Sequence, residues 1–187
     1  DINLKRNRLK ILQGYDQFSF YEINLEDQTA VEQLFNKDTP QRVIHLAAQA
    51  GVRYSLINPK SYIDNNIVGF FNVIDLAKKY KVKKIIYAST SSIYGIQNKF
   101  PIKENFDTNN PIQLYAATKK SNEVIAASYS KLYNINTIGL RFFTVYGPWG
   151  RPDMAMYIFT ENISKGKSIS VFNEGNMKRD FTFIDDI

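Results

Sequence analysis

The sequence predicts an α/β fold in which a doubly wound parallel sheet is covered by helices on both faces. Segments with the patterns of strands and of helices alternate along the 187 residues. The strand segments, such as "RVIHLAA" at 42–48 and "KIIYAS" at 84–89, are almost continuous apolar runs, as expected for buried parallel strands. No domain boundary is indicated before about residue 145, where "VYGPWGRPD" breaks the alternation.

Each element follows from its own pattern. The aromatic alternation of "FSFYEINL" predicts a strand, and a capping residue before Val31, Leu34 and Phe35 predicts the helix after it. The expected strands are 18–25, 42–48, 84–89 and 135–143. The expected helices are 27–37, 60–80, 114–132 and 154–165. The inner side of the long helix 60–80 is expected to carry Ile63, Ile67, Phe70, Phe71, Ile74 and Leu76. Residues 168–187 are expected to form two short extended pieces around a glycine-containing turn.

The composition restricts the classes of function. The chain has no cysteine and one histidine, His45, so neither a disulfide nor a metal site of thiolates or histidines is expected. No apolar run reaches the roughly 18–20 residues of a membrane span, and the polar, basic start "DINLKRNRLK" is unlike a secretory signal. We therefore expect no metal, no membrane partner and a cytoplasmic location.

The net charge is +6. Much of it lies in "LAKKYKVKK" at 76–84, where lysines at a helix C-terminus favour the helix dipole and stay solvated. A patch for a polyanion is the alternative, but no nucleic-acid recognition motif accompanies it, so we expect no nucleic-acid partner. A substrate that carries phosphates would also suit a positive protein.

Hydroxyl side chains follow the buried strand 84–89 in "YASTSSIYG", and a tyrosine and a lysine follow in "LYAATKKSNE". Tyr115 and Lys119 are one helical turn apart, about 40° around the axis, so both can face one ligand. A nearby ammonium lowers the pKa of a tyrosine, which can then exchange a proton with a substrate hydroxyl. This is the chemistry of alcohol–ketone interconversion. By itself the pair is also compatible with a packed Tyr115 and a solvated Lys119.

Five segments together carry a family resemblance: "HLAAQAGVRYS" (45–55), "YASTSSIYG" (87–95), "YAATKKSNE" (115–123), "RFFTVYGPWGRPDMA" (141–155) and "RDFTFIDDI" (179–187). The chain resembles the extended short-chain dehydrogenase/reductase superfamily of nucleotide-sugar enzymes, and within it the UDP-glucuronate 4-epimerases. The resemblance implies a partial Rossmann-like NAD-binding domain with the catalytic residues at 1–150. It also implies the start of a small substrate-binding domain at 151–187.

The resemblance implies an NAD cofactor and a UDP-sugar substrate that is oxidised and reduced again at C4, with UDP-glucuronate giving UDP-galacturonate as the expected reaction. The implied catalytic residues are Thr90, Tyr115 and Lys119. The implied cofactor-binding residues are Leu46, Ala47, Ala48, Asn66, Ser89, Tyr115, Lys119 and Phe142. The implied substrate-binding residues are Thr90, Thr144, Arg151, Phe172 and Arg179. Among these, Tyr115 is the expected base, Arg151 a sugar-carboxylate contact and Arg179 a phosphate contact.

The residues after Thr90 separate related reactions. Dehydratases of the superfamily carry Asp-Glu there, and decarboxylases that make UDP-xylose carry a glutamate at the second position. This chain has Ser91 and Ser92, which favours epimerisation. A UDP-glucose or UDP-N-acetylglucosamine 4-epimerase is the alternative.

The glycines nowhere form the family's Gly-x-x-Gly-x-x-Gly turn, which holds the NAD pyrophosphate. We therefore expect an internal piece of a longer enzyme, and a non-catalytic α/β fragment is the alternative reading. Helices 60–80 and 114–132 are the expected interface of a homodimer, since family members commonly pair through them.

Overall fold

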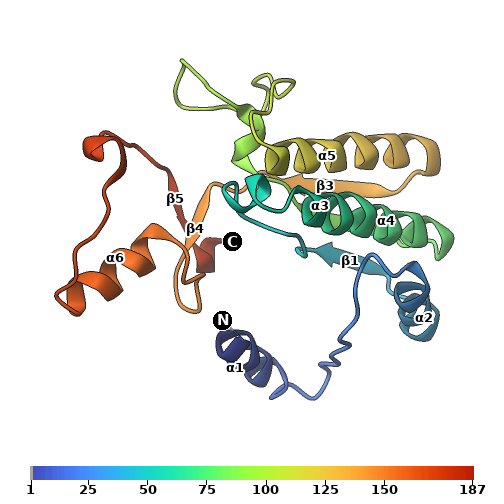
Figure 1. The fold of residues 1–187 in the computed structure, drawn as a ribbon. Helices are drawn as coiled ribbons and strands as arrows, with labels where there is room; N and C mark the ends of the chain where they lie inside the picture. The colour runs from blue at the N-terminus through green and yellow to red at the C-terminus, as the bar shows by residue number, and fades with distance from the viewer. Residues whose placement is uncertain (1) are drawn as a thin grey trace. The chain divides into compact units, whose positions relative to one another are not determined.

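The computed structural model describes residues 2–187, which form two compact units. One unit comprises residues 22–142, and the other comprises residues up to 21 together with 143–187 (Figure 1). Among the residues described, no helix is long and apolar enough to cross a bilayer. The assignment of 1–150 and 151–187 to a cofactor domain and a substrate domain stays a prediction about the whole protein.

The unit 22–142 contains a parallel sheet with the strand order β1-β2-β3. Its strands are β1 (Arg42–His45), β2 (Lys84–Ala88) and β3 (Asn136–Leu140). Its helices are α2 (Gln28–Asp38), α3 (Pro59–Tyr62), α4 (Gly69–Lys79) and α5 (Leu114–Tyr133). Short helical turns lie at η1 (Tyr54–Leu56), η2 (Ile63–Val68) and η3 (Ser91–Tyr94). The Rossmann-like α/β class is confirmed.

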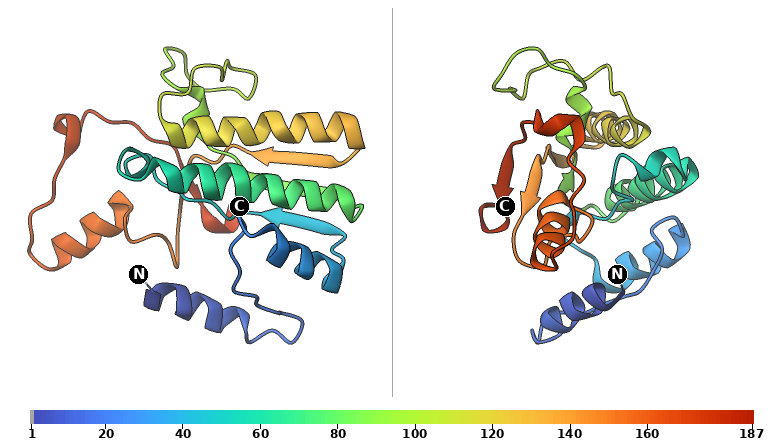
Figure 2. Two further views of the ribbon diagram at one scale, coloured as in Figure 1. Left: turned by 45° about the vertical axis from the view of Figure 1, so that its right-hand side comes forward. Right: turned by 60° about the vertical axis from the view of Figure 1, so that its left-hand side comes forward.

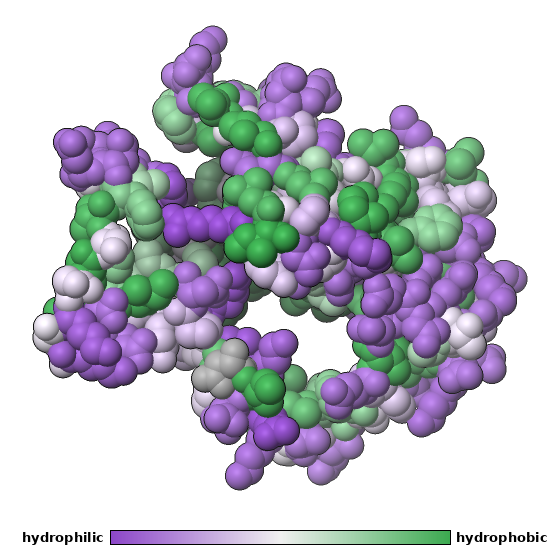
Figure 3. All heavy atoms as spheres, viewed as in Figure 1, coloured by the Kyte–Doolittle hydropathy of each residue, from purple (hydrophilic) through white to green (hydrophobic). Residues whose placement is uncertain are grey.

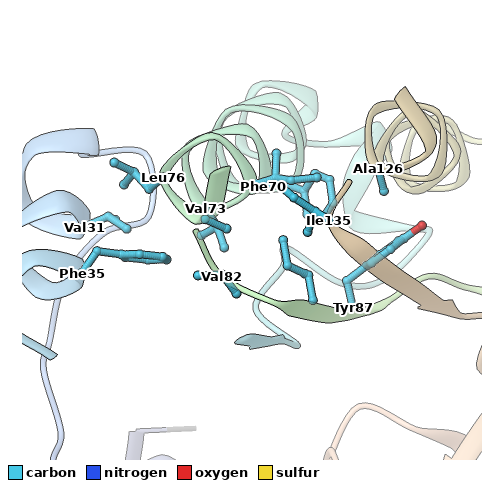
Figure 4. Packing of buried hydrophobic residues seen from close by; sticks show 12 residues of the cluster. Val31, Phe35, Phe70, Val73, Leu76, Val82, Tyr87, Ala126 and Ile135 are labelled. Carbon is cyan, nitrogen blue, oxygen red and sulfur yellow. The ribbon is translucent and has the colours of Figure 1, made fainter. Parts of the chain in front are cut away.

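The core of this unit lies between the sheet and the helices α2, α4 and α5 (Figure 4). Ile85 and Tyr87 of β2 point into it, and Phe70 of α4 packs against the ring of Tyr87 at a centroid distance of 5.2 Å. These helices cover one face of the sheet (Figure 2). On the other face Ile44 and Ile138 are 67% and 37% exposed, so the predicted cover on both faces is not found within this unit.

The strand predicted at 18–25 is wrong, because these residues form no strand and pair with none. The alternation does place Ile23 and Leu25 against the core, but a strand also requires a neighbour that accepts and donates its backbone hydrogen bonds. The helix predicted at 27–37 is confirmed as α2, and the side chain of its N-cap Asp27 accepts the amide hydrogen of Ala30 at 3.0 Å.

The long helix predicted at 60–80 is confirmed as one helical segment, α3–η2–α4, in which η2 is a π-helical turn. Ile63 and Phe71, predicted on its inner side, are 39% and 42% exposed. A π turn holds more residues than an α turn, so it changes which residues of the helix face the core compared with regular α-helical spacing. Phe71 lies at the border of the core-facing side of the helix, and its ring meets the ring of Tyr129 edge-on.

The second unit contains a parallel two-stranded sheet of β4 (Thr144–Tyr146) and β5 (Phe181–Phe183). It also contains α1 (Ile2–Leu12), α6 (Ala155–Ser164) and the turns η4 (Phe172–Gly175) and η5 (Ile184–Asp186). The predicted helix 154–165 is confirmed as α6. Of the two extended pieces predicted in 168–187, only β5 is a strand.

Candidate functional site

The carboxyl ends of β2 and β3 lie side by side in the unit 22–142. The amide of Ser89 donates a hydrogen bond to the carbonyl of Leu140 at 2.8 Å, and that of Ser91 donates to the carbonyl of Phe142 at 2.9 Å. The predicted site residues Ser89, Thr90 and Phe142 are therefore brought to one edge of the sheet. The oxygen of Thr90 accepts the amide hydrogen of Ser92 at 3.2 Å and so caps the turn η3.

The loop that follows β1 is held by Asn66, which is completely buried on the π turn. Its side-chain oxygen accepts the amide hydrogen of Gln49 at 2.7 Å, and its nitrogen donates to the carbonyl of Gln49 at 3.1 Å. The same nitrogen donates to the hydroxyl of Thr118 at 3.1 Å. Asn66 thus links the loop carrying residues 46–48 to α5, next to Lys119. Leu46 itself is 61% exposed beside this anchor.

Tyr115 lies in the first turn of α5, where its ring meets that of Tyr62 edge-on at a centroid distance of 6.1 Å. Lys119 follows one turn later and is only 1% exposed. Within residues 2–187 its ammonium has no hydrogen-bond partner, and burial lowers its pKa to about 8. A buried ammonium is costly unless acceptors surround it, so this site suits a ligand rich in hydroxyl oxygens. The ribose of a dinucleotide such as NAD fits that requirement.

His45, the last residue of β1, is 4% exposed beside this lysine. Burial and the charge of Lys119 lower its pKa to about 4, so its imidazole is neutral at pH 7. Its Nε2 has no partner among the described residues, and neither does the side-chain amide of Asn122, three residues after Lys119.

The second unit contains a cavity of about 590 Å³. Three predicted substrate residues, Thr144, Arg151 and Arg179, are among those that line it. Arg151 forms a two-pronged ion pair with Asp153, with its Nε donating to Oδ1 at 3.0 Å. Phe172 lies on η4 and does not line this cavity.

The structure therefore groups the predicted catalytic and cofactor residues in one unit and four of the five predicted substrate residues in the other, three of them at the cavity. Sequence reasoning gave no role to His45, Asn122, Glu123 or Arg141. For Glu123 a signal existed: it lies one helical turn after Lys119 and faces the same strand ends, where Ser89 donates to its carboxylate at 2.6 Å.

Residues 3–187 match the NAD dependent epimerase/dehydratase family. The chain belongs to this family. Epimerase/dehydratase relatives include a probable UDP-glucuronate 4-epimerase of Rhizobium meliloti (strain 1021), which is 51% identical over 187 residues. Protein CapI of Staphylococcus aureus is 50% identical over 186 residues. Each match covers all of this chain and 55% of the relative, so the chain spans about half the length of these family members.

Solved structures of the family have the same fold. A UDP-glucuronic acid 4-epimerase from Bacillus cereus, in complex with UDP-glucuronic acid and NAD, matches with a TM-score of 0.91 and 34% identity. That match covers 99% of this chain and 58% of the other. A UDP-glucose 4-epimerase from Thermotoga maritima, solved with UDP-glucose, matches with a TM-score of 0.86 and 34% identity over 89% of this chain and 55% of the other. The predicted family resemblance is confirmed, while the roles of individual site residues stay predictions.

Proposed function

We propose that this chain is the catalytic part of an NAD-dependent UDP-sugar 4-epimerase, with UDP-glucuronate as its substrate and UDP-galacturonate as its product. The observation that carries the proposal is the buried ammonium of Lys119, which has no hydrogen-bond partner within residues 2–187 and lies one helical turn from Tyr115 at the carboxyl edge of a parallel sheet. Sheets of this kind bind dinucleotides at that edge.

The proposed cofactor site consists of chain segments that hydrogen bonds within the protein hold together. Lys119 offers its ammonium to the ribose hydroxyls, and Asn66 holds the loop with residues 46–48 that lines the dinucleotide. Ser89 and Phe142 complete the edge of the sheet. A bound NAD would supply the hydride acceptor for the sugar C4 and would give the same hydride back to the opposite face of that carbon.

Tyr115 is the proposed base. The positive charge of Lys119 favours the ionised form of the tyrosine, which takes the proton of the sugar 4-hydroxyl and later returns it. The hydroxyl of Thr90 orients that sugar hydroxyl. Positions 91 and 92 hold serines, which carry no charge, and this supports epimerisation over the elimination of water.

The choice of UDP-glucuronate rests on the relatives and on Arg151. The probable UDP-glucuronate 4-epimerase of Rhizobium meliloti is 51% identical to this chain, and UDP-glucuronate 4-epimerase 4 of Arabidopsis thaliana is 49% identical. Arg151 lines the cavity of the second unit, and a guanidinium binds a carboxylate with two parallel hydrogen bonds. Arg179, on the same cavity, is proposed for the phosphates, and Thr144 and Phe172 for the rest of the nucleotide sugar.

The intact protein is proposed to be a cytoplasmic homodimer that pairs through the helices α3–α4 and α5. Hydrophobic side chains lie exposed over this region (Figure 3). Those that the structure leaves exposed there include Ile63, Val68, Phe71, Val124 and Leu132.

The test is to denature the purified intact protein, measure released NAD by chromatography, and then assay turnover of UDP-glucuronate beside UDP-glucose and UDP-N-acetylglucosamine. The proposal predicts about one NAD per chain and the fastest turnover with UDP-glucuronate. Faster turnover of a neutral sugar would support the alternative 4-epimerase. If the protein releases no NAD and turns over none of these sugars, the α/β unit is not catalytic.

A further inference from the structure

A half-buried ion pair joins the carboxyl end of β3 to the middle of α5. Arg141 directly follows β3, and its Nε and one terminal nitrogen each donate to a different oxygen of Glu123 at 2.9 Å. The side chains of Arg141 and Glu123 are 24% and 13% exposed. Burial acts to raise the pKa of Glu123, but its hydrogen bonds from Arg141 and Ser89 hold that pKa below the ordinary value. The carboxylate is therefore ionised and accepts hydrogen bonds only.

The same pair reaches three other segments. The hydroxyl of Ser89, at the end of β2, donates to Glu123 at 2.6 Å. Another terminal nitrogen of Arg141 donates to the hydroxyl of Tyr94 on η3 at 3.1 Å and to the carbonyl of Glu104 at 2.7 Å. The guanidinium of Arg141 and the carboxylate of Glu123 thus connect α5 to the residues after β2 and to the loop that precedes α5.

The hydrogen bonds around Arg141 and Glu123 form a network that reaches α5 close to the two proposed catalytic residues of that helix. Glu123 lies one turn after Lys119 and two turns after Tyr115, and a helix transmits a fixed height and rotation over so short a distance. On the strand side the contact is Ser89, the chain neighbour of Thr90. The network therefore fixes the side chains of α5 relative to the hydroxyls at the end of β2.

We propose that Glu123 and Arg141 are positioning residues, which hold Tyr115 and Lys119 of α5 in register with Thr90. The proposal rests on the proposed function, because it assigns the pair to the geometry of that reaction. A catalytic group that is displaced by about 1 Å can slow an enzyme up to about a hundredfold. Residues that hold such groups in position therefore act mainly on kcat.

The test compares Glu123→Gln and Arg141→Lys with the wild type in the intact protein. Glu123→Gln keeps the shape and an oxygen for Ser89 but removes the charge, whereas Arg141→Lys keeps the charge but removes the two-pronged contact. We expect each variant to lower kcat at least about tenfold, to change KM less than about threefold and to retain bound NAD. The double variant should lose no more than the worse single variant, since the two residues act as one unit.

Asp75→Asn is the matched control. Asp75 of α4 accepts hydrogen bonds from Lys78 at 2.7 Å and from Tyr129 near the far end of α5 at 3.1 Å, so it too is a half-buried carboxylate that contacts α5. The control should lower thermal stability without changing kcat. An unchanged kcat in Glu123→Gln, additive losses in the double variant, or an equal loss in Asp75→Asn would overturn the positioning role.

Amide hydrogen exchange separates failure of this proposal from failure of the proposed function. If the wild type has no epimerase activity, the proposed function fails, but the register of α5 is still measurable. Glu123→Gln should then speed exchange in residues 114–119 and 89–94, while Asp75→Asn should not. Equal exchange in both variants would overturn the positioning role in an inactive protein as well.

Discussion

His45 and Lys119 share one buried region, and the charge of Lys119 adds to burial in lowering the pKa of His45 to about 4. His45 is the last residue of β1, and its imidazole packs edge-on against Phe70, with ring centroids 5.4 Å apart. A charged His45 would place a second cation beside an ammonium that already lacks an acceptor among the described residues. The neutral imidazole is therefore part of what allows Lys119 to stay buried.

The first prediction is that stability falls as the pH drops from 6.5 to 4. In that window the unfolded state binds a proton at His45 that the folded state does not, so acid favours unfolding. The loss should approach about 3 kcal/mol, at about 1.4 kcal/mol for each unit of pKa shift. Urea unfolding at several pH values measures it, with His45→Gln as the control that lacks this component. A titration of His45 near pH 6.5 by NMR would contradict the prediction.

The second prediction separates the roles of Tyr115 and Lys119. Tyr115→Phe should lower epimerisation by about 10²–10⁴-fold, the usual contribution of a general base, and leave bound NAD almost unchanged. Lys119→Met should lower both the rate and the NAD content, because it removes the buried ammonium. Turnover and NAD released on denaturation are measured in parallel. Substantial turnover by Tyr115→Phe would exclude Tyr115 as the base.

Local patterns predicted the elements that carry the catalytic pair. The apolar run of β2 and the spacing of α5 indicated where Ser89, Thr90, Tyr115 and Lys119 would lie, because strand ends of a parallel sheet meet at one edge. The strand predicted at 18–25 failed because a strand depends on a partner elsewhere in the chain, which alternation does not reveal.

The ion pair of Glu123 and Arg141 could not be predicted for a similar reason. Its partners come from α5 and from the end of β3, and their contact depends on the order of the strands as well as on the rotation of the helix. The burial of His45 likewise depends on Phe70 and Lys119, which lie 25 and 74 residues away along the chain. Such contacts follow from tertiary packing, which no local pattern specifies.

The third prediction concerns Gly139, which pairs with Tyr87 across β2 and β3. A Cβ at Gly139 would lie 2.6 Å from the hydroxyl of Tyr87 and 2.7 Å from its ring, so the buried ring must move. Gly139→Ala should destabilise the protein by about 1–3 kcal/mol, the usual cost of overpacking. Chemical unfolding measures it. Tyr87→Leu in the same chain should make the Gly139→Ala substitution nearly neutral, and an equal cost in both backgrounds would show that the clash with Tyr87 is not the cause.

The last prediction tests the sugar preference through Arg151. In this structure its guanidinium is paired with Asp153, and the two side chains are 44% and 61% exposed, so an incoming carboxylate competes with a solvated partner. Arg151→Ala should raise KM for UDP-glucuronate about tenfold or more, because a hydrogen bond between charged groups contributes about 1.5–3 kcal/mol. The KM for UDP-glucose should change far less, since that sugar has no carboxylate. Asp153→Asn is the matched control: it frees the guanidinium, so the KM for UDP-glucuronate should stay the same or fall. Equal losses for both sugars in Arg151→Ala would return Arg151 to a structural role beside Asp153.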